Sequence, residues 1–508
     1  MGILRTLITK ALEQRFRRID RMRREPLSGQ QAIFKTLLQA GKNTAFGRAH
    51  HFAQIRSYAD FTKQVPVSPY EELYPYIERM LKGEQNVLWN TPVTQFSKSS
   101  GTTNARSKFI PVSAEALRDC HYKAGADLIS IYLEQKPGSR VLQGKNLGIG
   151  GSLGTHPQYP QSITGDISAL IMKNLPWWAQ IMRTPTLDVA LMDRWEEKIE
   201  RIARLTINED VTSLGGVPTW TVALLRRVME IKGTNNLLDV WPNLEVFLHG
   251  AVSFVPYRGL FREMIPGAQM SYIESYNASE GFFAIQDDLG LENQMLLMTE
   301  YGIFYEFIPA EHVGTPHAEP VPLEGVKPGI NYAIVISTNA GLWRYLIGDT
   351  VRFTSTDPYR ICISGRTRNF INAFGEELIV ENAETAISRA CAETGALVSN
   401  FTAAPVYMQR RSKGGHEWLI EFAREPQTTD IFAASLDKHL RSLNSDYDAK
   451  RSHDIALEAP IVQAVPPGTF AHWLGRQGKL GGQHKVPRLS NSREYVDEIA
   501  GMLQASGG

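Results

Sequence analysis

The sequence has little cysteine and no long hydrophobic run, and each absence narrows the kind of protein it encodes. Its 508 residues include three cysteines, Cys120, Cys362 and Cys391, with no Cys-x-x-Cys pair. This scarcity excludes a disulfide scaffold and a zinc site built from thiolates, and it suits a reducing compartment. No apolar run reaches the roughly 18 residues that a membrane span needs. The first ten residues are too polar for a secretory signal, so we expect a cytoplasmic protein.

An excess of one charge is also lacking, and so are the common metal and nucleotide motifs. With 54 basic and 53 acidic residues the formal net charge is +1, which gives no global field for nucleic acid. No His-Glu-x-x-His, P-loop or strand-linked Gly-x-Gly-x-x-Gly occurs, which disfavours zinc enzymes, P-loop NTPases and dinucleotide folds. Residues 150–154 match Gly-x-Ser-x-Gly, but Pro157 and Pro160 follow at once. A hydrolase nucleophile elbow would begin a helix at this point, which the two prolines disfavour. The segment is therefore predicted to be a glycine-rich loop.

The composition is that of an ordinary globular protein, 43% hydrophobic and 21% charged, and the length is enough for two or three domains. Helical periodicity alternates with strand-like runs along the chain. Helices are predicted over residues 1–45, 68–82, 113–134, 193–205 and 218–233. Strands are predicted over residues 243–249, 270–274, 295–308, 331–337 and 359–364, with a loop rich in proline between two of them, from Pro316 to Gly329. The chain is therefore predicted to be α/β, with layered sheets and helices.

A second, smaller unit is predicted after Gly365-Arg366-Thr367-Arg368. Beyond this segment the pattern restarts as a helix near 380–394, strands near 397–408 and 417–424, and a helix near 430–444. This α+β unit of about 140 residues has an ordinary domain size. We accordingly divide the chain into residues 1–367 and 368–508.

Residues 10–24 predict an amphipathic basic helix. Leu12, Phe16, Ile19 and Met22 recur at helical spacing among lysine and arginine residues. Such a helix can lie on an anionic membrane. More commonly it docks its apolar stripe on its own domain and leaves its cations in water, and we favour that interpretation.

The most informative segment runs from Ser97 to Lys108. It places serines and threonines around Gly101, with Lys98 and Arg106 beside them. Hydroxyls and glycine-spaced backbone N–H groups aim many short donors at a phosphate tail without bulk, and the cations balance its charge. The apolar flanks predict a strand, a loop and a second strand, although composition alone would also suit a solvated turn. The candidate phosphate ligands are Ser99, Ser100, Gly101, Thr102, Thr103 and Lys108.

Residues 271–281 form a second candidate segment, because an apolar strand leads there into Ser279, Glu280 and a glycine. Magnesium is bound through one or two carboxylates together with substrate phosphates, so Glu280 is a candidate metal ligand. Tyr276 is placed to flank a nucleotide base, and Ser279 adds a hydroxyl. Taken alone, Tyr276 would be a core residue and Glu280 would cap a turn.

Three further segments carry candidate binding residues. Asp349 follows Gly348 between two apolar runs, where it can accept both ribose hydroxyls; alone, this dipeptide would favour a tight hairpin turn. Arg366 and Arg368 lie at the predicted boundary, where an arginine can hold a ligand and set a domain angle. Lys485, in a glycine-rich loop near the C-terminus, can swing a point charge into a cleft.

The order of these motifs resembles the adenylate-forming superfamily, which includes acyl-CoA ligases and firefly luciferase. More closely, the chain resembles the Gretchen Hagen family of acyl acid amido synthetases over nearly its whole length. The likeness is carried by Ser99-Ser100-Gly101-Thr102-Thr103 with Lys108-Phe-Ile-Pro, Tyr276-Asn-Ala-Ser279-Glu280, Arg344-Tyr345-x-x-Gly348-Asp349 and Phe374-Gly375-Glu376-Glu377. Arg368 stands where acyl-CoA ligases often have an aspartate hinge, and Asn372 where they often have a lysine. These departures weaken the case for a CoA-dependent second step.

The resemblance implies a large N-terminal adenylation domain and a small mobile C-terminal α+β domain, with ATP and Mg²⁺ bound at the site. It also implies that a carboxylic acid is adenylated and that the acyl group then passes to an amine, such as that of an amino acid. By resemblance the hydroxyl loop wraps the phosphates, Glu280 helps to hold Mg²⁺, and Lys485 reaches the bridging oxygen.

The same resemblance assigns the nucleotide contacts. His249-Gly250-Ala251 matches the superfamily's adenine-binding strand end, and Tyr276 stacks on the base. Asp349 and Arg366 hold the ribose and the α-phosphate. The small domain then rotates about Arg368, which removes the terminal lysine and admits the amine.

Two other functions stay open at this point. One is an acyl-CoA or other thioester ligase, in which CoA takes the place of the amine. The other is a non-catalytic nucleotide-binding or membrane-surface protein that uses the basic helix. The acyl pocket is expected among residues 120–255, whose aromatic candidates are Tyr122, Trp177, Trp178, Trp220 and Phe254. We expect a monomer that acts on a small carboxylic acid and an amine, without nucleic acid.

Overall fold

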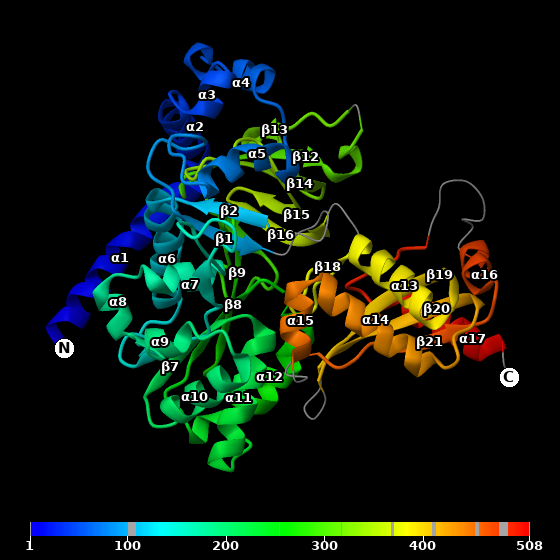
Figure 1. Ribbon diagram of the computed structural model, residues 1–508. Coiled ribbons are helices and arrows are strands. Elements are labelled where there is room, and N and C mark those ends of the chain that lie inside the picture. The colour runs from blue at the N-terminus through cyan, green and yellow to red at the C-terminus, as the bar shows by residue number, and fades with distance from the viewer. Residues whose placement is uncertain are drawn as a thin grey trace.

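The computed structural model shows a large lobe and a small lobe, with the small lobe set to one side (Figure 1). It describes residues 2–99, 108–252, 254–315, 317–366, 370–408, 413–452, 457–476 and 486–506. The large lobe comprises residues up to 366 and the small lobe begins at 370. The predicted division at 367/368 falls among residues outside the described ranges, and it stays a prediction.

A twelve-stranded mixed sheet is the frame of the large lobe. In spatial order its strands are β6 (Arg183–Thr184), β3 (Lys145–Gly148), β7 (Val211–Gly216), β8 (Val246–Gly250), β9 (Ser271–Ala278), β10 (Gly281–Ile285), β11 (Met295–Leu297), β16 (Tyr359–Arg366), β15 (Tyr345–Thr356), β14 (Asn331–Thr338), β12 (Ile303–Pro309) and β13 (Val321–Pro322). From β6 to β9 the neighbouring strands are parallel. From β9 to β13 every pairing is antiparallel. The parallel part therefore brings several strand ends to one edge of the sheet.

A second sheet of four strands stands beside the first. Its order is β2 (Lys108–Val112), β1 (Gln95–Ser99), β5 (Ile163–Gly165) and β4 (Leu153–Thr155). β1 and β2 are antiparallel, with Ser99 opposite Lys108, so the predicted pair of strands around the hydroxyl loop is confirmed. The Gly-x-Ser-x-Gly segment leads into β4 and not into a helix, which confirms that it is no nucleophile elbow.

Helices cover the large lobe. They are α1 (Gly2–Arg24), α2 (Pro26–Gly41), α3 (Ala45–Ala49), α4 (Tyr58–Gln64), α5 (Tyr70–Leu81), α6 (Tyr122–Gln135), α7 (Ile167–Lys173), α8 (Trp177–Ile181), α9 (Leu187–Ala190), α10 (Trp195–Thr206), α11 (Pro218–Lys232) and α12 (Arg258–Met264). A π-helical turn at Ala116–His121 leads into α6. Short 3₁₀ turns cover Phe52–Gln54, Leu237–Asp239, Val255–Tyr257, Ala310–His312 and Leu323–Gly325.

Two predicted elements are longer than the real ones. The helix predicted over 1–45 ends at Arg24, and a new helix begins at Pro26, because proline has no N–H for the preceding helix and suits a first turn. The strand predicted over 295–308 is two strands, β11 and β12. A turn separates them at Gly302, whose φ of +71° favours glycine.

The basic helix α1 docks on its own lobe, as predicted. Its apolar stripe is buried, with Ile19 3% and Met22 4% exposed. Two of its arginines point inward: Arg15 pairs with Asp127 of α6, and Arg23 pairs with Asp287, just after the end of β10. Burial and ion pairing therefore fix this helix against the rest of the lobe.

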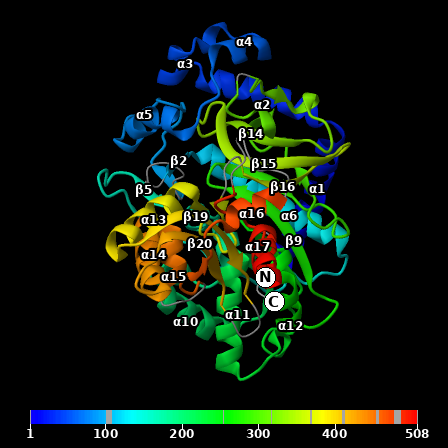
Figure 2. The same ribbon diagram turned by 90° about the vertical axis from the view of Figure 1, so that its right-hand side faces the viewer.

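The small lobe is a three-stranded sheet between two layers of helices, which Figure 2 shows from the side. Its elements are β17 (Phe370–Ile371), β18 (Leu378–Ile379), α13 (Val380–Thr394), β19 (Leu397–Val406), β20 (Gly415–Arg424), α14 (Thr429–Leu443), α15 (Ser445–Arg451), β21 (Ile461–Val465), α16 (Thr469–Arg476) and α17 (Glu494–Ser506). One face of the sheet packs on α13 and α14, and the other packs on α16 and α17. The two helices and two strands predicted here are confirmed.

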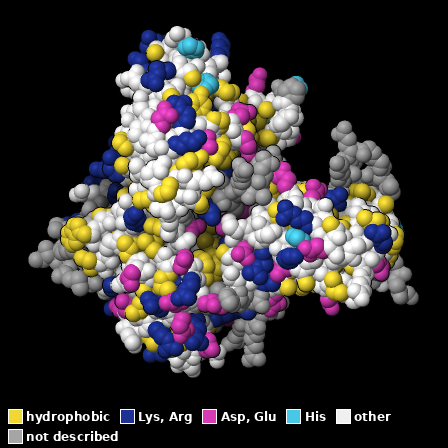
Figure 3. Space-filling view, in the orientation of Figure 1, with side chains coloured by type: hydrophobic (Ala, Val, Ile, Leu, Met, Phe, Trp, Pro, Cys, Tyr) yellow, Lys and Arg dark blue, Asp and Glu magenta, His cyan; other side chains and the backbone are white. Residues whose placement is uncertain are grey.

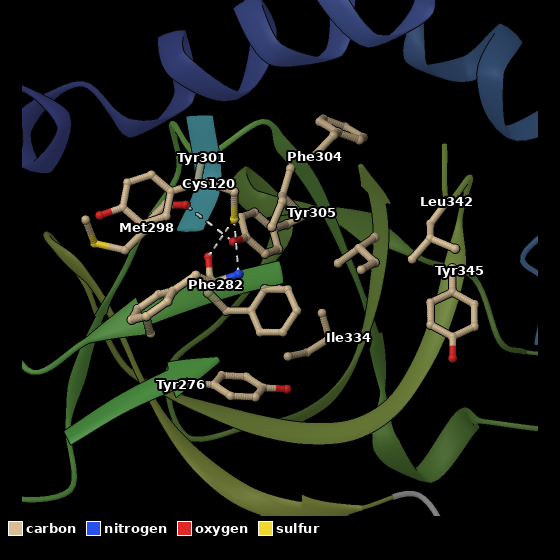
Figure 4. Close-up of a cluster of buried hydrophobic side chains, with 14 of the residues drawn as sticks. Cys120, Tyr276, Phe282, Met298, Tyr301, Phe304, Tyr305, Ile334, Leu342 and Tyr345 are labelled. Carbon is tan, nitrogen blue, oxygen red and sulfur yellow. Dashed lines mark hydrogen bonds between the residues drawn. The ribbon is translucent and has the colours of Figure 1, made fainter. Parts of the chain in front are cut away.

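The core of the large lobe reaches up to the strands that carry the candidate site. Figure 4 shows Tyr276 and Tyr345 at the margin of a cluster of buried aromatic and aliphatic side chains, whose packing fixes the rings. Cys120 lies within this cluster and accepts a hydrogen bond from the backbone N–H of Phe282. Among the described residues, no helix has the length and apolar character needed to cross a membrane.

Candidate active site

The carboxyl ends of the parallel strands form a glycine-lined edge. β3 ends at Gly148, β7 at Gly216 and β8 at Gly250. Ligands of open α/β sheets bind at this edge. At Gly250 an added Cβ would lie 2.4 Å from the carbonyl oxygen of Ser275 on β9, so only glycine fits there. The next residue, Ala251, has a φ of +70°, which turns the chain away from the strand.

The hydroxyl-rich strand β1 meets the β9–β10 turn at this edge. The Ser97 hydroxyl donates a hydrogen bond to the Ser279 hydroxyl at 2.9 Å. Ser99 ends the strand two residues later. Two segments that the sequence separates by 182 positions are thus in contact, and both were predicted to bind nucleotide.

Lys108, Tyr345 and Glu280 form a polar chain beside this contact, in which Lys108 and Tyr345 are buried and Glu280 is partly buried. The Lys108 ammonium donates to the Tyr345 hydroxyl at 3.2 Å, and that hydroxyl donates to Glu280 Oε1 at 3.3 Å. Burial raises the pKa of Glu280, and the positive charge of Lys108 opposes this shift. The arrangement holds a carboxylate and an ammonium close together without a direct ion pair.

Tyr276 and Asp349 are a second pair of predicted residues that the fold brings together. The Tyr276 hydroxyl donates to Asp349 Oδ2 at 2.7 Å, and both residues are buried. Gly348-Asp349 is not a hairpin turn, the interpretation that the dipeptide alone would favour, because it lies within β15. Asp349 is also the cross-strand partner of Arg366 on β16.

His249 is the last strand residue before Gly250, and it is neutral. Burial, with a smaller contribution from Arg258, lowers its pKa to about 3. Its ring stacks on Phe254 with centroids 4.1 Å apart. Its Nδ1 has no hydrogen-bond partner among the described residues. A buried polar atom without a partner at a ligand-binding edge is what a nucleotide base would satisfy.

Several predicted residues lie outside the described residues, so their roles stay predictions. They are Ser100, Gly101, Thr102, Thr103, Arg368 and Lys485. The side chain of Arg366 is likewise not described. The predicted residues that the structure brings to one edge are Ser99, Lys108, Gly250, Ala251, Tyr276, Ser279, Glu280 and Asp349.

Sequence reasoning did not assign a site role to Tyr345 or Ser97. Tyr345 joins Lys108 to Glu280, and Ser97 joins β1 to Ser279. A signal was present for Tyr345, because residues four apart in a strand share a face and Asp349 lies four positions later.

The aromatic candidates for the acyl pocket separate into buried and exposed residues. Trp177 is 66% exposed on α8, where Figure 3 shows hydrophobic side chains gathered on the surface, so it faces solvent. Phe254 is buried against His249, and Trp220 is buried against Trp195. The Tyr122 hydroxyl is buried with no partner among the described residues.

Comparisons with known proteins identify the family of this chain. Family models match the GH3 family N-terminal domain at residues 15–270, its central domain at 296–366 and its C-terminal domain at 381–494. The N-terminal match alone spans half of the chain. The indole-3-acetic acid-amido synthetase GH3.3 of Arabidopsis thaliana is 22% identical, over 92% of this chain and 90% of that protein.

Solved structures show the same fold. The AtGH3.15 acyl acid amido synthetase in complex with 2,4-DB matches with a TM-score of 0.59 and 17% identity, over 93% of both chains. A 2-hydroxyisobutyryl-CoA ligase in complex with 2-HIB-AMP and CoA matches with a TM-score of 0.55 and 13% identity, over 94% of this chain and 92% of that one. Together with the three family matches, these likenesses confirm the resemblance drawn from the motifs: the chain belongs to the GH3 family.

Proposed function

We propose that this protein is an ATP-dependent acyl acid amido synthetase. It adenylates a small carboxylic acid and transfers the acyl group to the amine of an amino acid. The observation that carries the proposal is the convergence of Lys108, Glu280 and the Tyr276–Asp349 pair at the glycine-lined edge of the sheet. The family supports it, because the Arabidopsis relative is named as an amido synthetase of indole-3-acetic acid.

The residues at the edge suit the two ends of ATP. The end of β1 and Lys108 offer hydroxyls and a cation, which match the phosphate tail. His249 offers an unpartnered ring nitrogen for the base. Asp349, held by Tyr276, is assigned to the ribose.

Glu280 is the residue we assign to magnesium. No group of three or more His, Cys, Asp or Glu side chains gathers at one point among the described residues, so the protein offers no complete metal cage there. A single carboxylate is sufficient when substrate phosphates supply further oxygens. Bound in this way, the ion would neutralise charge on the phosphates. Tyr345 orients Glu280 and keeps it apart from Lys108.

The reaction has two steps. First, a carboxylate oxygen of the acid bonds to the α-phosphorus of ATP, the bond to the bridging oxygen breaks, and pyrophosphate leaves. Then the amine nitrogen bonds to the acyl carbon, the bond from that carbon to the phosphate oxygen breaks, and AMP leaves as the nitrogen loses a proton. The first transition state concentrates negative charge, which fixed donors and cations such as Lys108 stabilise.

The second step distinguishes an amido synthetase from a thioester ligase. The thioester ligase is the alternative function, because a CoA ligase has the same fold. An amine acceptor gives an amide, whereas the CoA thiol gives a thioester. We also propose that the enzyme is a cytoplasmic monomer; its three cysteines form no disulfide, which suits a reducing compartment.

A pyrophosphate-release assay tests the proposal. The purified protein receives ATP, Mg²⁺ and a panel of aryl, indolyl and fatty acids, with mixed amino acids or CoA in parallel wells. Acid-dependent release that amino acids accelerate is the expected result. Acceleration by CoA alone would favour the thioester ligase. No release with any acid, despite measurable ATP binding, would favour a non-catalytic nucleotide-binding protein.

A further inference from the structure

Residues 149–152 form a loop whose backbone carbonyls accept hydrogen bonds from one buried lysine. The loop follows β3 at the glycine-lined edge, next to the end of β7. The ammonium of Lys198, on α10, donates to the carbonyl oxygens of Gly150 at 2.6 Å and Gly151 at 3.0 Å. Its third donor goes to the carbonyl of Met192 at 3.0 Å. Lys198 is completely buried, and its three donors match three acceptors.

The other side of this loop is fixed as well. An added Cβ on Gly151 would lie 1.9 Å from the Asp166 carboxylate, which accepts the backbone N–H of Ser152 at 2.8 Å. The loop therefore has one shape as long as Lys198 stays in place. Because it lies at the edge where the nucleotide is proposed to bind, and within residues 120–255, where the acyl pocket is expected, its shape bears on substrate binding.

Lys198 is linked to the small lobe through stacked rings. Its ammonium lies 4.6 Å from the centroid of the Trp195 ring. Trp195 stacks face to face on Trp220, with centroids 3.8 Å apart and planes 7° from parallel. The ammonium of Lys450, on α15 of the small lobe, lies 5.5 Å from the centroid of the Trp220 ring. We name this series the docking relay: Lys450, Trp220, Trp195 and Lys198.

The contact at Lys450 is part of the docking of the small lobe. Close by, the Tyr257 hydroxyl of the large lobe donates to the carbonyl of Ala373 at 2.6 Å, and it contacts the Thr219 hydroxyl at 3.2 Å. Gly375 lies against Lys450, where an added Cβ would be 3.2 Å from Lys450 Cε. This junction includes the Phe374-Gly375-Glu376-Glu377 motif, to which the function above gives no role.

We propose that the docking relay couples the docked position of the small lobe to the shape of loop 149–152, with Lys198 as the positioning residue of that loop. The proposal rests on the proposed function, because acid binding is the property that the loop controls. When the small lobe undocks, Trp220 loses the cation on its face. The stack with Trp195 then loses support, and the cover over the Lys198 ammonium loosens.

Single variants at the two ends of the relay give the first test. Lys198→Met is expected to raise the KM for the acid by at least about tenfold, with a smaller change in kcat, because the loop carbonyls lose their donors. Lys450→Met is expected to raise this KM about fivefold. Lys450→Arg retains a cation over the ring and is expected to stay near wild type. Lys438→Met is the matched control, since its exposed ammonium pairs with Glu393 on the same lobe and faces no tryptophan of the relay.

The double variant decides the proposal. If the relay couples the two lysines, Lys450→Met adds nothing to the KM of Lys198→Met, whereas effects of independent residues multiply. Multiplying effects, or an equal effect of Lys438→Met, would overturn the proposal. Trp195→Leu breaks the relay in its middle and replaces Lys198→Met in the same cycle if that variant does not fold.

A second readout does not need activity. The same cycle is measured on thermal unfolding midpoints, where coupled residues again give less than the sum of their single effects. If wild type releases no pyrophosphate with any acid but the unfolding cycle shows coupling, the proposed function fails while the link between the lobe and the loop holds. If the unfolding effects are additive, the relay is absent whatever the activity.

Discussion

Two charged clusters meet at the beginning of β15, and they differ in how fully their groups are paired. In the first, the Arg344 guanidinium donates to both carboxylate oxygens of Glu306 at 2.8–3.1 Å and to the carbonyl of Val65 at 2.6 Å. The second cluster begins one residue later, where the Tyr345 hydroxyl stands between Lys108 and Glu280 at 3.2 and 3.3 Å.

The difference separates a structural pair from a site. We call the first cluster closed, because the charges of Arg344 and Glu306 pair with each other and the Tyr58 hydroxyl donates a further hydrogen bond to Glu306. In the second, Lys108 uses one of its three donors among the described residues, and its charge has no direct carboxylate partner there. Buried charges that keep unused hydrogen-bonding capacity are expected where a charged ligand binds.

The largest effect on stability is expected in the closed cluster. Arg344→Met leaves the Glu306 carboxylate buried without its cation, and we expect a loss of about 3–5 kcal/mol in the free energy of unfolding. Chemical denaturation measures it. The control is the exposed pair of Arg441 and Asp448, 41% and 45% exposed, where Arg441→Met should cost less than about 1 kcal/mol. Similar losses in both variants would show that the closed cluster has no special structural role.

The largest effect on activity is expected in the open cluster. Glu280→Gln removes the proposed magnesium ligand while keeping the shape of the side chain. Pyrophosphate release with the best acid should fall about 100-fold. The matched control is Glu274→Gln, because Glu274 lies on β9, the strand that leads into the turn of Glu280, and burial also raises its pKa. We expect that variant to keep near wild-type activity, and an equal loss would remove the special role of Glu280.

Stability should move the other way in Glu280→Gln. Since burial raises the pKa of Glu280, the folded state binds its proton more tightly than the unfolded state, whose pKa is near 4.5. The contribution of this residue to stability therefore falls as pH rises above 4.5. At neutral pH the glutamine variant should unfold at a higher temperature than wild type, and the gap should close at acidic pH. A lower unfolding temperature at neutral pH would contradict the sign.

The parts of the site that the sequence predicts are local. The hydroxyl run before Lys108 and the Gly348-Asp349 dipeptide each show their chemistry within a few residues, and strand patterns place the hydroxyl run beside a strand end. Their contacts are not local. Tyr276 and Asp349 are 73 positions apart, and their pairing depends on the order of strands in the sheet, which no single segment encodes.

Lys198 shows what a pattern can indicate and what it leaves out. In α10 it lies three positions after Trp195 and four before Ile202, on the apolar stripe of the helix. A lysine there is a signal of burial, since lysine is almost never fully buried without partners. Its partners are backbone carbonyls of another segment, which carry no side-chain signature, so they could not be predicted.

A smaller effect is expected from the residue that joins the open cluster. Tyr345→Phe keeps the ring in the core and removes the hydroxyl between Lys108 and Glu280. We expect pyrophosphate release to fall about tenfold, the size of one lost hydrogen bond to charged groups. Tyr305→Phe is the control, because its buried hydroxyl donates to the carbonyl of Met298, away from the site. A full loss of activity in Tyr345→Phe would mean that the hydroxyl contacts substrate directly.

The smallest effect is expected in the pH dependence of stability at Lys198. This third charged side chain is buried, and its ammonium is hydrogen-bonded to backbone carbonyls and not to a carboxylate. Burial lowers its pKa to about 8, although the charges of Asp166 and Asp193 oppose the shift. In the unfolded chain the amine keeps its ordinary pKa of 10.5, so above pH 8 the unfolded state binds more protons than the folded state. The stability contributed by Lys198 therefore rises with pH between these values and is constant below pH 8.

The measurement is the difference in unfolding midpoint between wild type and Lys198→Met across this range. This difference should stay constant up to about pH 7.5. Above that pH the midpoint of wild type should rise relative to that of the variant, because the buried ammonium loses its proton. Lys232→Met, at the exposed end of α11, is the control, because it removes a lysine without changing a buried site. A level difference for Lys198→Met would mean that the three carbonyls hold the ammonium as well as water does. The burial of Lys198 would then cost no stability, as expected for Arg344 with its carboxylate partner. The closed and open clusters would in that case differ only in how many hydrogen-bond partners their charged groups have.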